Sequence, residues 1–369
     1  MATDSIHNVR TAPELRKRLE ERERLSLRPF AALARESRGR ARPEDEHPYR
    51  TAYQRDRDRI LHTKAFRRLK RKTQVFFATA GDHYRTRLTH TLEVAQIART
   101  AARALFLNED LVEAIALGHD LGHTPFGHAG EAVLNEVHSE GFSHTEQSVR
   151  IVDHLESTRH GRGLNLTFEV RDGILNHSRA KAILMGKPGP PPTKRWSATL
   201  EGDLVSVCDA VAYINHDIDD AVRGGLITLH DLPKGAIDAL GTTSSERINT
   251  MVGALIEGSP EDAIDMTPDV REATWALRSY LYANLYPCEA ISREIRKGKK
   301  IVRELYYHLL EHSPSEATAD ISDAPVLPGG ETPLEDTLER RIVDLVAGMT
   351  DQYALDLYKR HFFPESWQA

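Results

Sequence analysis

Helical periodicity is the feature that most constrains how this chain can fold. From Tyr49 to about Gly225, and again toward the C-terminus, apolar residues recur with a period near 3.6, as they do along one face of an α-helix. The sequence contains no alternating apolar and polar series of any length, which is the pattern of a half-buried strand. We therefore expect a mostly α-helical protein, built as a helical bundle with additional helices at its C-terminal end.

Two predicted helices follow each other in the first half of the chain. One covers residues 85–107, and the next opens at Asn108, a good N-cap residue, and closes around 118–122. The apolar residues expected along one side of the first helix are Leu88, Leu92, Ala95, Ala98, Ala102 and Leu105.

Capping residues mark further helices. Ser143 and Glu146 have the spacing of a capping box, which predicts a helix start at this point. A long helix over 200–222 ends at Gly224, a natural C-cap. Helical patterns also cover residues 271–310 and 334–360.

Three segments differ from this pattern. Arg and Glu alternate over 14–24, which predicts a solvated helix followed by a loop at 37–40. The proline-rich stretch 186–192 cannot be helical and predicts a semi-rigid surface loop. Residues 313–333 are rich in Pro, Gly, Asp and Ala, which favours a long loop or flexible link.

Composition excludes several classes of protein. The 369 residues include 49 Lys and Arg against 55 Asp and Glu, a net charge of −6, which rules out a histone-like basic binder and a disordered polyelectrolyte. No stretch reaches the ~18 apolar residues of a membrane span, and the N-terminus lacks the apolar core of a signal peptide. Cys208 and Cys288 cannot form a disulfide framework. We therefore expect a cytoplasmic protein without a membrane partner.

Histidine is unusually frequent, with 18 in the chain, and residues 118–131 concentrate it. This segment, GHDLGHTPFGHAGE, holds three His, one Asp and one Glu. The His119-Asp120 dipeptide alone means little, because two other His-Asp dipeptides occur in the sequence. A protein core would not tolerate so many unpaired imidazoles, whereas imidazole and carboxylate together hold divalent cations. The segment therefore predicts a metal site.

Two other helices carry polar residues in apolar surroundings. His90 lies on the helix predicted over 85–107, where a lone histidine is more often a satisfied core residue. Asp209 lies in an apolar run, where a carboxylate is costly unless it is paired or bound to metal. Tyr213 and Asp217 follow at i+4 and i+8, so these three side chains share one helix face.

The order His90, His119-Asp120, Asp209 resembles the H…HD…D metal signature of the HD superfamily of phosphohydrolases. Longer motifs resemble one branch, the deoxyguanosinetriphosphate triphosphohydrolase (dGTPase) family, from about Leu33 to Trp367. These motifs are QRDRDRI (54–60), AFRRLK (65–70), KTQVF (72–76), RTRLTH (85–90), the segment 118–131, GFSH (141–144), EQS (146–148), NHDIDD (215–220) and GMTD (348–351).

The resemblance implies a domain plan and a metal site. An N-terminal arm and helix (1–48) would precede an HD phosphohydrolase core (49–230), and a C-terminal helical region (231–369) would pack on that core. Two nitrogens and two carboxylates would leave positions for water and a phosphate oxygen, which suits Mn²⁺, Mg²⁺ or Fe²⁺ better than structural zinc. The implied metal ligands are His90, His119, Asp120 and Asp209.

Catalytic and phosphate-contacting residues are implied in the same way. His128 and Glu131 match the catalytic pair of the family, and their spacing makes them neighbours on the first turn of a helix. A histidine that titrates near neutral pH can exchange a proton with water or a leaving oxygen, and a carboxylate can orient it. His123 and His144 match positions that contact phosphates in relatives, although each could instead be structural. Arg87 precedes His90 by three residues, so its guanidinium should face the metal and bind phosphate oxygens.

Sugar recognition is implied for Gln74, Tyr213 and Asp217. A ring packed against C2′ would exclude ribose by steric clash, and a carboxylate would accept a hydrogen bond from the 3′-hydroxyl. From the residues alone, Tyr213 would instead be interpreted as a core aromatic.

Local cations must attract an anionic substrate to this acidic chain, and two groups are candidates. Most of the first group are better explained as a solvated or inter-subunit surface. The first group is Lys64, Arg67, Arg68, Lys70, Arg71 and Lys72, and the second is Lys187, Lys194 and Arg195.

The predicted function is a metal-dependent hydrolase that cleaves dGTP or another dNTP into deoxynucleoside and triphosphate. Two alternatives stay open: another HD-type nucleotide phosphohydrolase or phosphodiesterase, and a non-catalytic regulator that binds deoxynucleotides or single strands. The sequence lacks the Gly-Tyr-Pro motif that is typical of the cyclic-dinucleotide branch. Alarmone hydrolases carry Glu-Asp shortly after the His-Asp pair, whereas this sequence has His123-Thr124 there. The resemblance further implies a homo-oligomer, and it allows a dNTP effector and single-stranded nucleic acid as partners.

Overall fold

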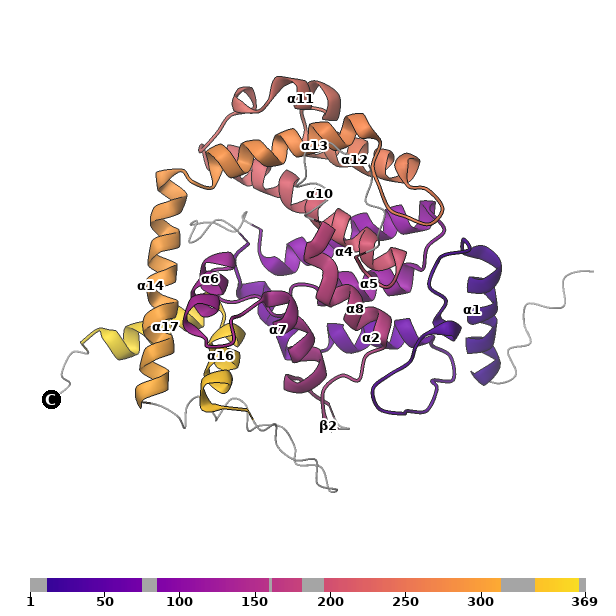
Figure 1. Cartoon of the computed structure of the whole chain (residues 1–369), viewed down its shortest axis with the longest axis horizontal. Helices are drawn as coiled ribbons and strands as arrows, with labels where there is room; N and C mark the ends of the chain where they lie inside the picture. The colour runs from indigo at the N-terminus through magenta and orange to yellow at the C-terminus, as the bar shows by residue number, and fades with distance from the viewer. Residues whose placement is uncertain (1–11, 75–84, 159–160, 181–195, 313–335, 365–369) are drawn as a thin grey trace, which may run out of the picture.

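The computed structural model describes residues 12–74, 85–158, 161–180, 196–312 and 336–364. These residues are predominantly helical, which confirms the predicted fold class (Figure 1). The strands in the described part of the chain are β1 (Ser157–Thr158) and β2 (Gly161–Arg162), which pair as one short antiparallel hairpin.

Short helices alternate with longer ones in residues 12–180. The α-helices are α1 (Ala12–Ser26), α2 (Ala52–Leu61), α3 (Lys64–Arg68), α4 (Arg87–Ala104), α5 (Glu109–Gly118), α6 (His128–Val137), α7 (His144–Arg150) and α8 (Phe168–Asn176). The 3₁₀ and π turns are η1 (Ala34–Glu36), η2 (Leu69–Arg71), η3 (Ile151–Leu155) and η4 (His177–Ala180).

Longer helices dominate the remainder of the chain. The α-helices are α10 (Leu200–Arg223), α11 (Lys234–Leu240), α12 (Ser244–Gly258), α13 (Pro268–Tyr280), α14 (Glu289–His312), α16 (Leu338–Gly348) and α17 (Asp351–Phe362). The turns are η5 (Leu229–Asp231) and η6 (Leu281–Leu285).

The helix α10 runs through the centre of the larger apolar core. Every residue from 200 to 218 is buried, and α4, α5, α8 and α12 all pack against this helix. Thr199 caps its N-terminus by accepting a hydrogen bond from Gly202 N (3.1 Å), and Gly224 is the C-cap, as predicted. Polar side chains on α10 are therefore fixed deep inside the protein.

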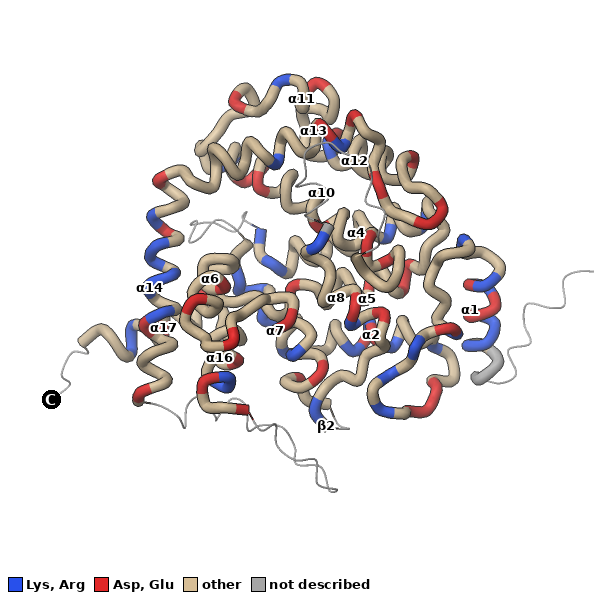
Figure 2. Tube along the Cα trace, viewed as in Figure 1, with Lys and Arg blue, Asp and Glu red and all other residues tan. Residues whose placement is uncertain are grey.

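A second apolar core lies beside the first. It joins α6 to α14, α16 and α17, which Figure 1 shows on the side of the molecule opposite α1. Lys and Arg follow the outer side of α14, whereas they alternate with acidic residues on α1 (Figure 2). The larger core itself continues past residue 230 into α11, α12 and α13, and the predicted division into 1–48, 49–230 and 231–369 stays a prediction.

Two details of the helix prediction are wrong. Leu92 is 48% exposed, although Ala95, Ala98, Ala102 and Leu105 of the same predicted side are buried, because the buried face of α4 extends toward Val94 and Ile97 instead. The helix α7 begins at His144 as expected, but Ser143 forms no side-chain cap. Instead, a Glu131 oxygen accepts the hydrogen bond from His144 N (2.9 Å), so a carboxylate from α6 replaces the predicted capping box.

The predicted long C-terminal helices are each divided in two. The helical pattern over 271–310 is interrupted after η6, where Pro287 cannot continue a helix. The pattern over 334–360 is interrupted between α16 and α17, because Thr350 caps a new helix by accepting a hydrogen bond from Tyr353 N (3.2 Å). The predicted loops at 186–192 and 313–333 lie outside the described residues, as do Lys187, Lys194 and Arg195.

Candidate active site

The His-Asp pair stands at the buried end of α5. Asn108 caps the start of this helix by accepting a hydrogen bond from Leu111 N (3.3 Å). The helix ends at Gly118, and His119 Nδ1 donates a hydrogen bond to Ala116 O (2.6 Å). This bond fixes the His119 ring and leaves Nε2 as the atom available to a ligand.

Two other helices complete a cluster around His119. His90 comes from α4 and Asp209 from α10, and the distance from His90 Nε2 to Asp209 Oδ1 is 3.0 Å. His119 Nε2 lies 3.7 Å from the same oxygen and 3.4 Å from Asp120 Oδ1. All four side chains are buried. The fold thus brings together the four predicted ligands from three helical segments that are distant in sequence.

The chemistry of this cluster fits a cation. His119 Nε2 is buried without a hydrogen-bond partner, and its lone pair faces the carboxylates of Asp120 and Asp209. Such an arrangement is costly unless a cation lies between the groups. Burial raises the pKa of Asp120, but His119 and Arg87 outweigh burial and hold this pKa well below its usual value. The chain therefore has a His/Asp cluster that could hold a metal ion.

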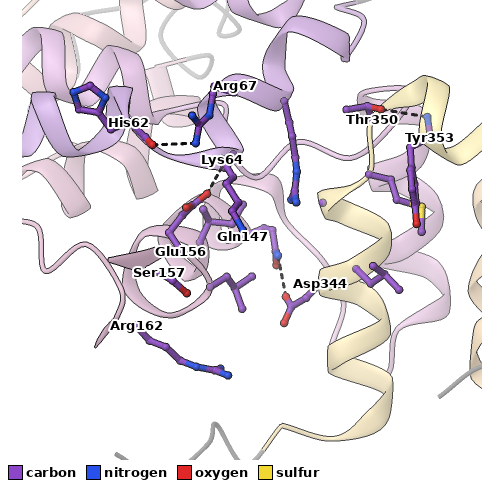
Figure 3. A pocket seen from close by; sticks show the side chains of 17 residues that line it. His62, Lys64, Arg67, Gln147, Glu156, Ser157, Arg162, Asp344, Thr350 and Tyr353 are labelled. Carbon is purple, nitrogen blue, oxygen red and sulfur yellow. Dashed lines mark hydrogen bonds between the residues drawn. The ribbon is translucent and has the colours of Figure 1, made fainter. Parts of the chain in front are cut away.

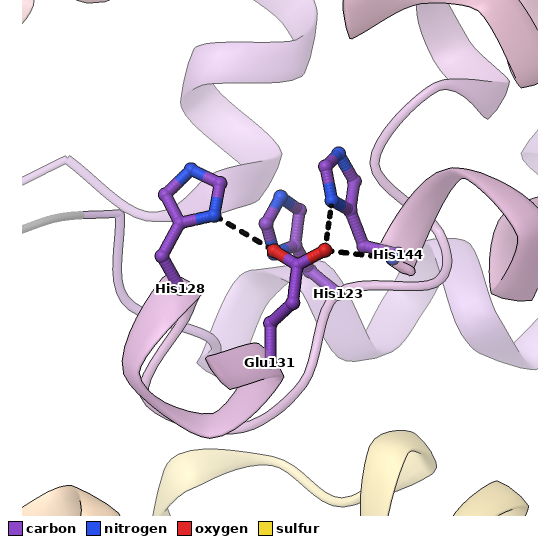
Figure 4. Close-up of side chains that lie close together, drawn as sticks. All are labelled: His123, His128, Glu131 and His144. Atoms are coloured by element: carbon purple, nitrogen blue, oxygen red, sulfur yellow. Dashed lines mark hydrogen bonds and ion pairs between the residues drawn. The ribbon is translucent and has the colours of Figure 1, made fainter. Parts of the chain in front are cut away.

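Beside this cluster, a second group of side chains is organised by Glu131 (Figure 4). Its Oε2 accepts a hydrogen bond from His128 Nδ1 (2.8 Å), and its Oε1 accepts one from His144 Nδ1 (2.7 Å). Burial raises the pKa of Glu131, but the bonds from the two histidines outweigh burial and keep this pKa far below its usual value. The carboxylate therefore stays charged and orients both rings by their Nδ1 atoms.

His128 and its neighbours differ in exposure. The His128 side chain is 60% exposed and lines the cavity, whereas the Glu131 side chain is only 18% exposed. His123 stacks on His144 with ring centroids 4.0 Å apart, and burial holds the pKa of His123 well below its usual value. His177, which the sequence did not predict, lies with its Nε2 3.3 Å from His144 Nε2, and burial lowers its pKa to about 3.

Two glycines allow the segment 118–131 to pack this closely. A Cβ atom on Gly122 would lie 2.3 Å from both His144 O and Ser148 N of α7. Gly127 has a φ of +55°, and a Cβ there would lie 2.8 Å from a guanidinium nitrogen of Arg87. Larger residues at either position would displace α7 or Arg87 from the site.

A cavity of about 400 Å³ opens onto both groups of side chains. The two predicted site residues that do not line it are His119 and Glu131, which contact the lining from behind. The predicted residues that line it are Gln74, Arg87, His90, Asp120, His123, His128, His144, Asp209, Tyr213 and Asp217.

Arg87 connects the metal cluster to the segment that carries Gln74. Its Nη1 donates a hydrogen bond to Asp120 Oδ2 (2.9 Å), and its Nη2 donates one to Gln74 O (3.4 Å). The side chain is buried, and it faces the cavity as its spacing from His90 predicted. By contrast, none of the six predicted cations between Lys64 and Lys72 lines this cavity.

The other end of the cavity is closed by residues that the sequence did not single out. Arg278 Nε donates a hydrogen bond to Tyr213 Oη (2.7 Å), and Tyr286 Oη donates one to Asp217 Oδ2. Burial raises the pKa of Asp217 to about 7. Tyr282 also lines the cavity. No spacing or motif connects Arg278, Tyr282 and Tyr286 with α10, so only the folded chain reveals them.

In the described part of the chain, no helix combines the length and apolar character that crossing a membrane requires.

The comparisons with known proteins agree with this geometry. Residues 87–214, which contain all four clustered ligand candidates, match the HD domain family. Residues 264–360, which contain Arg278 and Tyr286, match the Phosphohydrolase-associated domain. Fold and site therefore define an HD-domain phosphohydrolase.

Relatives narrow the class further. A deoxyguanosinetriphosphate triphosphohydrolase-like protein of Caldanaerobacter subterraneus is 51% identical over 96% of this chain and 97% of its own length. Proteins of the same description from Desulfatibacillum aliphaticivorans and Clostridium perfringens are 46% and 43% identical, each over 95% of this chain and 98% of the relative. The chain belongs to the deoxyguanosinetriphosphate triphosphohydrolase-like family.

Proposed function

We propose that this protein is a metal-dependent triphosphohydrolase that cleaves dGTP, or another dNTP, to deoxynucleoside and triphosphate. The observation that carries the proposal is a single cavity lined by three kinds of side chain. A metal-ligand cluster contains Asp209, an acid-base pair contains His128, and the far end carries Tyr213 and Asp217. A nucleotide bound across this cavity would have its phosphates, its scissile bond and its sugar beside a matching group.

The phosphates of the substrate would be bound by a metal ion and by cationic side chains together. A divalent ion, with Mn²⁺ and Mg²⁺ preferred and Fe²⁺ as a further candidate, would polarise the α-phosphate and orient the attacking water. Its proposed ligands are His90, His119, Asp120 and Asp209, the cluster described above. Arg87 lies beside Asp120 and would contact a phosphate oxygen, as would His123 and His144, which line the same cavity.

His128 and Glu131 would move the proton. Water would attack the α-phosphorus and release one proton to the solvent, while the bond from phosphorus to the sugar 5′-oxygen breaks. The leaving 5′-oxygen would take a proton from His128 Nε2, which is later reprotonated from the solvent. Glu131 holds His128 Nδ1 by a 2.8 Å hydrogen bond and stabilises the charged ring. The charge of Glu131 is secured by its second bond, to His144 Nδ1 (2.7 Å).

The sugar end would select deoxyribose. Tyr213 and Asp217 are held in place by Arg278 and Tyr286, so the ring and the carboxylate have fixed positions when substrate enters. The Tyr213 ring would occupy the space of a 2′-hydroxyl, Asp217 would accept a hydrogen bond from the 3′-hydroxyl, and Gln74 would contact the same sugar.

Product analysis tests the proposal. The protein is incubated with each of the four dNTPs, singly and in pairs, with Mn²⁺ or Mg²⁺. The proposal requires release of intact triphosphate and deoxynucleoside. Release of phosphate or pyrophosphate would favour another nucleotide phosphohydrolase, and no release would favour a binding regulator. The cytoplasmic location, the homo-oligomer, the dNTP effector and the binding of single-stranded nucleic acid stay predictions.

A further inference from the structure

The backbone directly before His128 is strained. Phe126 has a φ of +60°, which is uncommon for a residue other than glycine, and Gly127 follows with a φ of +55°. His128 is the first residue of α6, and Gly127, the N-cap, has no side chain that could cap this helix. A strained turn of this kind persists only where its surroundings hold it. The contacts of the turn therefore decide where the His128 ring lies.

A single carboxylate from the C-terminal helices holds this turn. Asp351 Oδ1 accepts a hydrogen bond from Phe126 N (3.0 Å). Its Oδ2 accepts two bonds from Thr73, one from N (3.0 Å) and one from Oγ1 (2.6 Å). Asp351 is the last residue of the GMTD motif, to which the proposed reaction gives no role. The carboxylate joins the turn before His128 to the segment before Gln74, across 225 and 278 residues of sequence.

The position of Asp351 is fixed by the fold. This buried residue is the first of α17, directly after Thr350, which caps the helix by accepting a hydrogen bond from Tyr353 N (Figure 3). The preceding helix α16 is tied to α7, because Asp344 accepts a hydrogen bond from Gln147 (2.9 Å), which Figure 3 also shows. The two C-terminal helices therefore give the carboxylate a fixed place beside the turn.

Two further contacts support the same region. The buried Lys72 donates hydrogen bonds from Nζ to His123 O and to Ala347 O, the last at 2.9 Å, so it ties the catalytic segment to α16. The Phe126 ring lies close to α14, where a Cβ atom on Gly298 would be 3.1 Å from it. The turn is thus held by the second apolar core, and Asp351 bonds to the backbone of the strained residue itself.

We propose that Asp351 is a positioning residue, which anchors the turn at Phe126 and Gly127 and thereby places the His128 ring for proton transfer. The role of His128 rests on the proposed function, whereas the anchoring of the turn depends on no reaction. An amide in place of Asp351 would offer one oxygen only, and its NH₂ group would face one of the two backbone N–H groups. A displacement of about 1 Å at a reacting group can lower the rate by about 10²-fold.

Amide hydrogen exchange of the metal-free protein, resolved to single residues by mass spectrometry, tests the anchor without turnover. In Asp351→Ala the Phe126 amide should exchange about tenfold faster or more, because a charge-assisted hydrogen bond is lost. The matched control is Asp356→Ala, which removes an exposed carboxylate from the same helix. Its exchange at Phe126 should stay within about twofold of the unmodified protein, since distant sites act independently.

Asp351→Asn is the second test variant, because it keeps the side-chain volume and one acceptor oxygen, and its exchange should be intermediate. Circular dichroism checks the fold of each variant. Unchanged exchange at Phe126 in Asp351→Ala would overturn the proposal. Faster exchange of the same size throughout the chain in both Asp351 variants would show a general loss of stability and would overturn it as well.

A double-mutant cycle tests whether the anchor acts through His128. The measurement is kcat for the dNTP that the unmodified protein cleaves best, with metal content checked by elemental analysis. Asp351→Ala should lower kcat about 10–10²-fold at full metal content. In the His128→Ala background the same change should lower kcat less than about threefold, because coupled residues are not additive. An equal factor in both backgrounds would indicate general structural support and would overturn the proposal.

The two experiments separate this proposal from the proposed function. No cleavage of any dNTP by the unmodified protein would refute the proposed function, and the exchange result at Phe126 would then decide on the anchor by itself. Release of triphosphate with unchanged exchange in Asp351→Ala would leave the proposed function standing and refute the anchor.

Discussion

The two ends of the catalytic cavity are completed in different ways. At the metal end, His119 Nε2 is buried and lacks a hydrogen-bond partner, and it faces Asp120 and Asp209. At the proposed sugar end, Tyr213 is already paired with Arg278 of α13, and Asp217 with Tyr286, which follows η6. A bound cation would satisfy the proposed metal end, whereas the proposed sugar end is already paired within the protein. Changes at the first should abolish function, and changes at the second should adjust selectivity.

The largest effect is expected from Asp209→Ala. This change removes the carboxylate that both His90 and His119 face, so bound metal and turnover should be lost while the helical fold remains. Elemental analysis and circular dichroism measure the two outcomes. Asp219→Ala, on the same helix but outside the cavity lining, should keep its metal. Full metal content in Asp209→Ala would show that the metal site is assigned wrongly.

A smaller loss is expected from His128→Ala, which removes the proposed proton donor and leaves the ligand cluster intact. Turnover should fall about 10²–10⁴-fold, the usual effect of removing a positioned acid-base group. Metal content and nucleotide binding, measured by elemental analysis and calorimetry, should not change. Normal turnover in this variant would reduce His128 to a residue at the start of α6, and Glu131 would lose its role with it.

At the sugar end, Tyr213→Ala should narrow the preference for dGTP over GTP by about 10²-fold, since a lost clash changes discrimination by a few kcal/mol. The measurement is kcat/KM for both nucleotides. Tyr213→Phe is the matched control, because it keeps the ring and removes the hydroxyl that accepts a hydrogen bond from Arg278. The sugar-reading assignment fails if Tyr213→Ala leaves the ratio unchanged, or if the unmodified protein cleaves both nucleotides equally.

The smallest effect concerns stability and pH. Burial raises the pKa of Asp217 to about 7, whereas the unfolded value is about 4. Between these values the folded protein binds the proton more tightly than the unfolded chain, so stability should fall as pH rises from about 4 to 7. One group contributes at most about 1.4 kcal/mol per pH unit. Denaturant unfolding of the metal-free protein measures this. As pH rises, the free energy of unfolding of Asp217→Asn should decline less steeply than that of the unmodified protein. Identical pH slopes in the two proteins would contradict the burial argument.

The same two ends explain what the sequence could predict. At the metal end, His119, His123, His128 and Glu131 lie in one short segment of the sequence, and the spacing of His128 and Glu131 makes them neighbours on the first turn of α6. The central helix α10 was likewise predictable from its apolar pattern and its glycine C-cap.

The sugar end depends on tertiary contacts, which leave no local pattern. Arg278 and Tyr286 reach α10 from more than 60 residues away in sequence, and neither lies in a recognisable motif. The wrong capping box has the same origin, because Glu131 of α6 caps α7 in place of a local side chain. Packing between helices, rather than propensity within them, decided each of these details.

Turnover of dGTP in water enriched in the heavy oxygen isotope tests the central claim most directly. If both ends of the cavity act on one nucleotide and water attacks the α-phosphorus, mass spectrometry will find one labelled oxygen in the released triphosphate and none in the deoxyguanosine. Label in the deoxyguanosine, or release of phosphate or pyrophosphate in place of triphosphate, would contradict the account.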